Sequence, residues 1–151
     1  MKLVIQRVSR AGVTVDGEKV GSIGVGAVVL VGVARDDTEH DAKYLARKTA
    51  QLRIYDDADG KLNASIDAVN GAFLVVSQFT LYGDCGKGNR PSYIEAADPA
   101  EGERLYEEYV AALRATGHEV RTGVFRAMMD VDLVNDGPVT LLLESRGRTA
   151  S

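Results

Sequence analysis

Two short segments carry the residue types that could perform chemistry in this chain. The first is Ser77-Gln78-Phe79-Thr80-Leu81, where polar side chains follow an apolar run. A strand that ends in a loop is a natural place for a site, because the strand fixes the geometry and the loop gives access. The same residues also fit a plain strand with one polar face. The second segment, Asn135-Asp136-Gly137-Pro138-Val139-Thr140, has the composition of an ordinary turn.

Few other residues offer side-chain chemistry. The sequence has one cysteine, Cys85, and two histidines, His40 and His118, which are too few ligands for a usual metal centre. No Gly-x-Ser-x-Gly motif marks a nucleophilic serine. A hydrolase of small esters built on Cys85 or Ser77 would have to recruit a histidine, and neither histidine has an obvious acidic partner in the sequence. We expect no metal and no cofactor, and a surface or capping role for both histidines.

Charge limits the possible partners. Lys and Arg total 18 and Asp and Glu total 22, so the net charge is −4 with neutral histidines. A protein that grips a long nucleic-acid backbone usually presents a basic surface. The composition therefore argues against DNA as a partner, but not against capture of an RNA terminus. Local basic groups remain, including Lys87 and Arg90 in a glycine-rich loop, and any RNA contact is expected to be local.

Length and composition indicate one globular domain spanning residues 1–151. The chain is 45% hydrophobic and 26% charged, which suits a single core. No apolar stretch approaches the ~20 residues of a membrane span, and the N-terminus turns polar too soon for a signal peptide. A single cysteine suits a reducing compartment. These features favour a cytoplasmic protein, and the C-terminal residues 145–151 are expected to be frayed.

The first half of the chain is predicted to alternate strands with one helix. Asp16-Gly17 has the residues of a two-residue hairpin turn, since both positions tolerate a positive φ. A helix is expected from about residue 38 to residue 53, with Thr38 and Asp41 forming an approximate capping box. A further turn follows at Asp56–Gly60. Strands are expected at 2–8, 13–15, 18–25 and 26–33.

The second half contains a clearly punctuated helix. Asp98 can cap it, Pro99 suits its first position and Gly117 can end it. Residues 135–138 are expected to be the turn that joins the last two strands. The order of elements favours an α+β fold, with a barrel-like, mostly antiparallel sheet and two main helices. The strands are expected at 72–77, 118–122, 129–134 and 139–143.

Together, Ser77–Leu81 and Asn135–Thr140 resemble the two signature motifs of D-aminoacyl-tRNA deacylases. The likeness extends to Val4–Val8, Gly88–Ser92 and Gly123–Phe125, and so covers essentially the whole chain. It implies the fold of that family and an enzyme that binds the 3′ end of aminoacyl-tRNA. The reaction it implies is hydrolysis of the ester of D-aminoacyl-tRNA, and of glycine mischarged on other tRNAs, as chiral proofreading.

The resemblance also implies a homodimer and a role for each motif. Gly137 and Pro138 would form a cis peptide bond that reaches into the other subunit, takes the substrate's α-ammonium on its carbonyls and excludes L side chains. Arg7 would steady this segment. Catalytic positions are implied for Ser77, Gln78, Phe79 and Thr80, with main-chain groups near Phe79 and Thr80 contacting the ester. Contacts with the terminal adenosine or a phosphate are implied for Phe125, Met129, Lys87 and Arg90.

One departure and several alternatives stay open. The family often has Phe-Gly-Ala-Asp-Met where this chain has Phe125-Arg126-Ala127-Met128-Met129, which leaves the adenosine contact open and offers Arg126 for a phosphate. An aminoacyl ester carries a neighbouring ribose 2′-hydroxyl, so positioning and main-chain donors can supply the catalysis without a side-chain base. Thr80 as a nucleophile is the competing mechanism. A non-catalytic module that binds RNA ends is the competing function.

Overall fold

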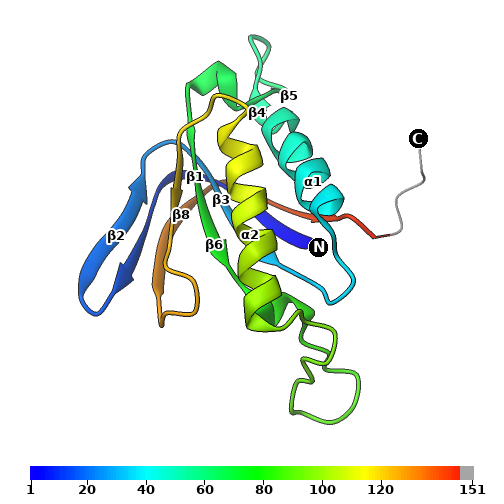
Figure 1. Cartoon of the computed structure of the whole chain (residues 1–151). Coiled ribbons are helices and arrows are strands. Elements are labelled where there is room, and N and C mark those ends of the chain that lie inside the picture. Colours follow the sequence, from blue (N-terminus) through cyan, green and yellow to red (C-terminus); the bar gives the residue numbers. More distant parts are fainter. Residues whose placement is uncertain (147–151) are drawn as a thin grey trace.

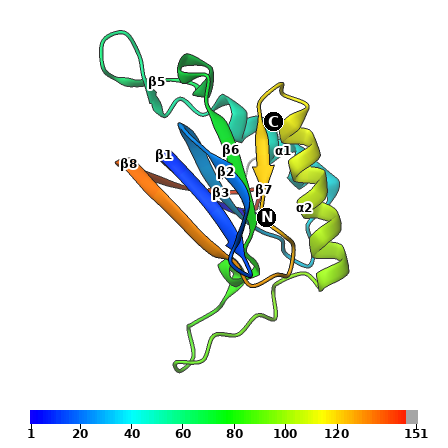
Figure 2. The same ribbon diagram turned by 90° about the vertical axis from the view of Figure 1, so that its left-hand side faces the viewer.

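The computed structural model describes residues 1–146 and shows an α+β fold (Figures 1 and 2). The α+β class and the two main helices were predicted from the order of elements, and the helices lie side by side on one face of a strongly curved sheet. Neither helix in the described part of the chain is long and apolar enough to cross a membrane. Of the C-terminal segment expected to be frayed, residues 147–151 lie outside the described residues.

The first strand is longer than predicted. Strand β1 runs unbroken over Lys2–Val15, where two strands at 2–8 and 13–15 were expected. Residues 9–12 have weak strand propensity, but Ala11 and Gly12 pair with β2 (Glu18–Ile23) on one side and with β8 (Asp130–Glu144) on the other. Pairing on both sides therefore overrides the local preference. The Asp16-Gly17 turn is confirmed, with φ values of 50° and 80°.

The main sheet has six strands and is nearly closed. Its order is β2-β1-β3-β6-β7, with β8 paired to β1, where β3 is Gly26–Gly32, β6 is Ala72–Ser77 and β7 is Val120–Thr122. All three pairings of β1 are antiparallel, while β3 and β6, and β6 and β7, are parallel. Parallel neighbours need long crossovers, and the two helices supply them. The predicted barrel-like, mostly antiparallel sheet is confirmed.

The helices begin where their capping residues predict. Helix α1 (Glu39–Gln51) follows Thr38, which forms a capping box with Asp41. Helix α2 (Pro99–Arg114) follows Asp98, whose side chain accepts a hydrogen bond from the main chain of Glu101 at 3.0 Å. Both helices bury one apolar face against β3 and β6 to form the main core. The small elements are β4 (Tyr55–Asp56), β5 (Leu62–Ala64) and the 3-10 helices η1 (Ile66–Val69) and η2 (Phe79–Tyr82).

The two residues after β8 are anchored, which corrects the expectation of fraying from residue 145. Ser145 is buried, its main chain donates to the carbonyl of Met1 at 3.0 Å, and its hydroxyl accepts from the Met1 ammonium at 2.9 Å. Arg146 forms ion pairs with Asp36 and Glu95. The position at the end of the chain suggested fraying, but these partners lie far away in the sequence and could not be seen in it.

We expect Asp37→Asn to lower the free energy of unfolding by about 3 kcal/mol, because it removes the charge partner of a buried ammonium. The Met1 nitrogen lies 2.6 Å from Asp37 Oδ1, and both side chains are almost fully buried. Urea unfolding measures the change. Asp36→Asn is the control, since Asp36 pairs with Arg146 at the surface and such pairs contribute about 0–1 kcal/mol. Equal effects of the two substitutions would contradict the prediction.

Candidate active site

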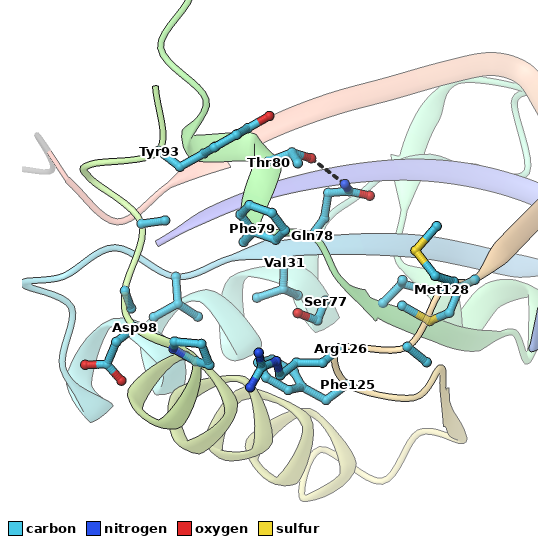
Figure 3. A pocket seen from close by; sticks show the side chains of 18 of the residues that line it. Val31, Ser77, Gln78, Phe79, Thr80, Tyr93, Asp98, Phe125, Arg126 and Met128 are labelled. Carbon is cyan, nitrogen blue, oxygen red and sulfur yellow. Dashed lines mark hydrogen bonds between the residues drawn. The ribbon is translucent and has the colours of Figure 1, made fainter. Parts of the chain in front are cut away.

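A pocket of about 710 Å³ opens where β6 ends, beside the first turn of α2 (Figure 3). One wall is Ser77–Thr80, at the end of β6 and the start of η2. The opposite wall is the turn after β7, with Phe125 and Met129. The fold thus brings together two groups of residues that the sequence analysis singled out separately.

The end of β6 presents its polar residues to the pocket. Gln78 still donates its main-chain N–H to the Val31 carbonyl at 2.8 Å, which fixes the strand up to the point where η2 begins. The Gln78 side-chain amide donates a short hydrogen bond to the Thr80 hydroxyl (Figure 3). Phe79 is 57% exposed, and its ring meets Tyr93 edge-on at 5.1 Å between centroids. Tyr93, which was not foreseen, therefore holds an otherwise free aromatic ring at the pocket wall.

Main-chain donors are available beside these side chains. The first N–H groups of a helical segment have no partner within it. Within residues 1–146, neither the Phe79 nor the Thr80 main-chain nitrogen donates a hydrogen bond to another group. Donors held on a fixed backbone can stabilise a developing oxyanion. The wall can therefore act on an ester without an ionisable side chain.

The opposite wall is built on buried aromatic packing. Phe125 packs against Tyr106 at 5.8 Å between ring centroids, and Gly123 leaves room for Met129, whose sulfur would lie 2.6 Å from a Cβ at that position. Tyr106 donates its hydroxyl hydrogen to the Val75 carbonyl at 3.0 Å. Burial raises the pKa of Tyr106 to about 12, so this hydroxyl stays protonated near neutral pH and supplies no base.

Two charged side chains line the pocket within the described part of the chain, Asp98 and Arg126. Asp98 is engaged in capping α2. Arg126 is exposed and has a φ of 67°, in the left-handed region that favours glycine. The glycine that the family often has here fits this conformation without strain. The replacement by arginine noted in the sequence therefore has a steric cost in the backbone.

We expect Arg126→Gly to raise the free energy of unfolding by about 1 kcal/mol, because glycine takes the left-handed conformation without a steric penalty. Chemical denaturation of the two proteins measures the difference. Arg126→Ala is the matched control, since it removes the same charge but keeps a Cβ at the strained φ. A gain in stability that is equally large for alanine would assign the effect to charge and not to the backbone.

The second motif is a bulge within one strand, which corrects the predicted turn between two strands. Gln6 of β1 pairs with Thr140 of β8, and Val8 pairs with Asn135. The four residues 136–139 therefore stand opposite the single residue Arg7, and the pairing continues on both sides. An extra segment of this kind is forced out of the sheet. Gly137 and Pro138 are accordingly exposed, and the peptide bond between them is cis.

Arg7 and Asn135 hold this bulge from inside. The buried Arg7 guanidinium donates to the Asp136 carbonyl at 3.2 Å and to the Ile54 carbonyl at 2.9 Å, and it pairs with the Asp136 carboxylate at 3.3 Å. The Asn135 amide donates to the carbonyls of Arg7 and Val139, each at 3.0 Å. Glycine suits position 137 because its φ of 122° lies in a region that L residues rarely adopt, and a Cβ there would also crowd Arg7 Nη2 at 3.0 Å and Val139 Cγ2 at 2.9 Å.

Other candidate residues lie elsewhere. Lys87 and Arg90 are exposed in the loop between η2 and α2, and neither lines the pocket. The residues of the bulge and Arg7 do not line the pocket of their own chain either. His118 has an acidic partner that its sequence neighbours did not show: Asp67 lies 2.7 Å from Nε2. Neither histidine lines the pocket, which counts against a serine hydrolase built on Ser77.

The chain matches a known family over almost its whole length. The family model described as D-Tyr-tRNA(Tyr) deacylase covers residues 4–144. D-aminoacyl-tRNA deacylases of Thermus aquaticus and Halalkalibacterium halodurans are 59% and 57% identical, over 96% and 97% of this chain and 95% and 100% of their own. The class is thus that of deacylases, enzymes that hydrolyse an ester on tRNA. The chain belongs to the D-aminoacyl-tRNA deacylase family, which confirms the resemblance seen in the two motifs.

Solved structures share the same fold. The structure of c-Myc DNA Unwinding Element Binding Protein superimposes with a TM-score of 0.90 at 40% identity and covers 96% of this chain and 99% of that one. A structure described as that of a probable eukaryotic D-amino acid tRNA deacylase gives a TM-score of 0.82 at 15% identity, over 95% and 98% of the two chains. The second likeness concerns the fold alone.

Proposed function

We propose that the pocket binds the aminoacyl-adenosine end of D-aminoacyl-tRNA in the cytoplasm and releases the D-amino acid by ester hydrolysis. The observation that carries the proposal is the pairing of an apolar wall, Phe125 and Met129, with a polar strand end, Ser77–Thr80, across one pocket. A purine base suits the apolar wall, and an ester carbonyl suits the main-chain donors. Glycine mischarged on other tRNAs, which lacks a side chain, fits the same site.

Main-chain positioning and the substrate itself supply the catalysis in this proposal. The N–H groups of Phe79 and Thr80 stabilise the oxyanion, which typically contributes about 10²–10³-fold in rate for each donor. The ribose 2′-hydroxyl next to the ester orients the attacking water. Thr80 is a poor nucleophile here, because its hydroxyl accepts from the Gln78 amide, which is no base.

The selection against L-aminoacyl groups requires a second copy of the chain. The bulge with Gly137 and Pro138 is exposed and lies outside the pocket of its own chain, so it can reach only a neighbour's pocket. Strand β8 pairs only with β1 among the described strands and exposes Leu142, 74% accessible, together with Val131 and Val134. Val131 also lines the pocket. A copy docked along β8 at Val131 would therefore lie beside the pocket.

Hydrolysis of matched D- and L-tyrosyl-tRNA tests the proposal. We expect rapid loss of the D ester and persistence of the L ester, from a species that sediments at twice the chain mass of 16.2 kDa. Binding of both tRNAs without ester loss would support a non-catalytic module instead. Loss of activity on alkylation of the exposed Cys85 would support a thiol hydrolase. Equal hydrolysis of both esters would contradict the chiral role.

A further inference from the structure

Arg126 differs in position from the other cations of the domain. It carries the one positive charge in the pocket lining of the described chain, and it forms no ion pair or hydrogen bond within residues 1–146. Its side chain points into the pocket from the turn that carries Phe125, on the side opposite Phe79 and Thr80 (Figure 3). An exposed guanidinium without a partner, at the rim of a pocket, is available to an anionic group.

The backbone at this position adds a second observation. Three non-glycine residues of the described chain have a positive φ, namely Asp16, Asn70 and Arg126. Asp and Asn tolerate the left-handed region, whereas arginine does not favour it. Strained residues of this kind gather at ligand sites. At this strained position the chain carries a long cationic side chain beside the pocket. A glycine at the same position would avoid the strain but would leave the pocket rim without a positive charge.

We propose that Arg126 binds the phosphodiester that joins the terminal adenosine of the tRNA to the preceding nucleotide. The inference rests on the proposed function, in which the ester lies at Ser77–Thr80 and the adenosine against Phe125. The phosphate on the 5′ side of that adenosine then leaves the pocket at its rim, where Arg126 stands. A guanidinium can donate two parallel hydrogen bonds to phosphate oxygens. Arg126 is thus a binding residue for the RNA backbone and not for the aminoacyl group.

Steady-state kinetics with two substrates test this assignment. D-tyrosyl-tRNA carries the phosphate, and D-tyrosyl-adenosine lacks it. We expect Arg126→Ala to raise KM for the tRNA about tenfold and to reduce the slope of log KM against log salt concentration by about 0.7, the value for one contact to a single strand. We expect no change in KM or kcat for D-tyrosyl-adenosine, which has nothing for the guanidinium to bind.

Three further variants control the result. Arg47→Ala removes an exposed cation of α1 that does not line the pocket, and it should leave both substrates unaffected. Arg126→Gly, expected to be more stable than the wild type, should lose the same affinity, so unfolding cannot explain the loss. Arg126→Lys keeps the charge and should retain the salt slope with a smaller rise in KM.

Either of two results would overturn the assignment in an active enzyme. One is an unchanged KM and salt slope for D-tyrosyl-tRNA in Arg126→Ala. The other is an equal loss with D-tyrosyl-adenosine, which would place Arg126 on the adenosine or the amino acid. A wild-type protein that leaves both D esters intact would instead contradict the proposed function itself, a distinct outcome.

Discussion

Gly137→Ala should reduce kcat/KM for D-tyrosyl-tRNA about 100-fold or more, because a misplacement of about 1 Å in a positioned group can cost that much. The added Cβ would lie 2.9 Å from Val139 Cγ2 and 3.0 Å from Arg7 Nη2, at a φ of 122° that L residues rarely adopt. We therefore expect the backbone of the bulge to shift. Since its main-chain carbonyls are proposed to receive the substrate's ammonium, their displacement weakens binding of the D substrate.

Gly17→Ala provides the matched control. Gly17 also has a left-handed φ, of 80°, but a Cβ there meets nothing within 4 Å. The hairpin turn between β1 and β2 does not line the pocket. This variant should lose about 1 kcal/mol of stability and keep its activity. If Gly137→Ala retained full activity and full discrimination between D and L esters, the bulge would have no part in the site.

The second large effect is expected from the substrate. D-tyrosyl-tRNA that ends in 2′-deoxyadenosine should be hydrolysed about 10²-fold or more slowly than the ribose form, since it lacks the hydroxyl that positions the attacking water. Thr80→Ala should retain most of the activity on the ribose substrate, because the proposed oxyanion donor at this residue is its main-chain N–H. Single-turnover rates for the two substrates and the two proteins give all four values.

The opposite pattern would establish a covalent mechanism. A folded Thr80→Ala protein with no activity, together with normal hydrolysis of the deoxy substrate, would make the Thr80 hydroxyl the nucleophile. Gln78→Ala helps to separate the two cases. This substitution removes the donor to the Thr80 hydroxyl. The single-turnover rate on the ribose substrate should therefore change little if that hydroxyl takes no part in the reaction.

Local sequence signals predicted the parts of the fold that depend on interactions between neighbouring residues. The caps Thr38 and Asp98 placed both helices, and Asp16-Gly17 placed the first hairpin, because each feature depends on neighbouring residues. The strand end at Ser77–Thr80 could be singled out for the same reason. For the opposite wall, Phe125 and Met129 were implied only by the family resemblance, because they meet this strand end only through the crossover that α2 provides.

The bulge shows where such reasoning fails. Asp136-Gly137-Pro138 has the residues of a turn, and taken alone it predicts a hairpin. The structure keeps both flanking segments on the same neighbour, β1, and Arg7 fills the space beneath. That outcome depends on a pairing between residues more than a hundred positions apart. The partner of His118, Asp67, was hidden for a similar reason, because it lies 51 positions away in the sequence.

Subunit complementation tests most directly whether the site is shared between two copies. Ala127→Trp would fill the pocket, to whose lining Ala127 belongs, and Gly137→Ala would displace the bulge. Each homodimer should be nearly inactive toward D-tyrosyl-tRNA. After random exchange of subunits, heterodimers contain one site built from an intact pocket and an intact bulge, so activity should return to about a quarter of the wild-type level. A mixture that stays inactive, although heterodimers form, would mean that each chain builds its site alone.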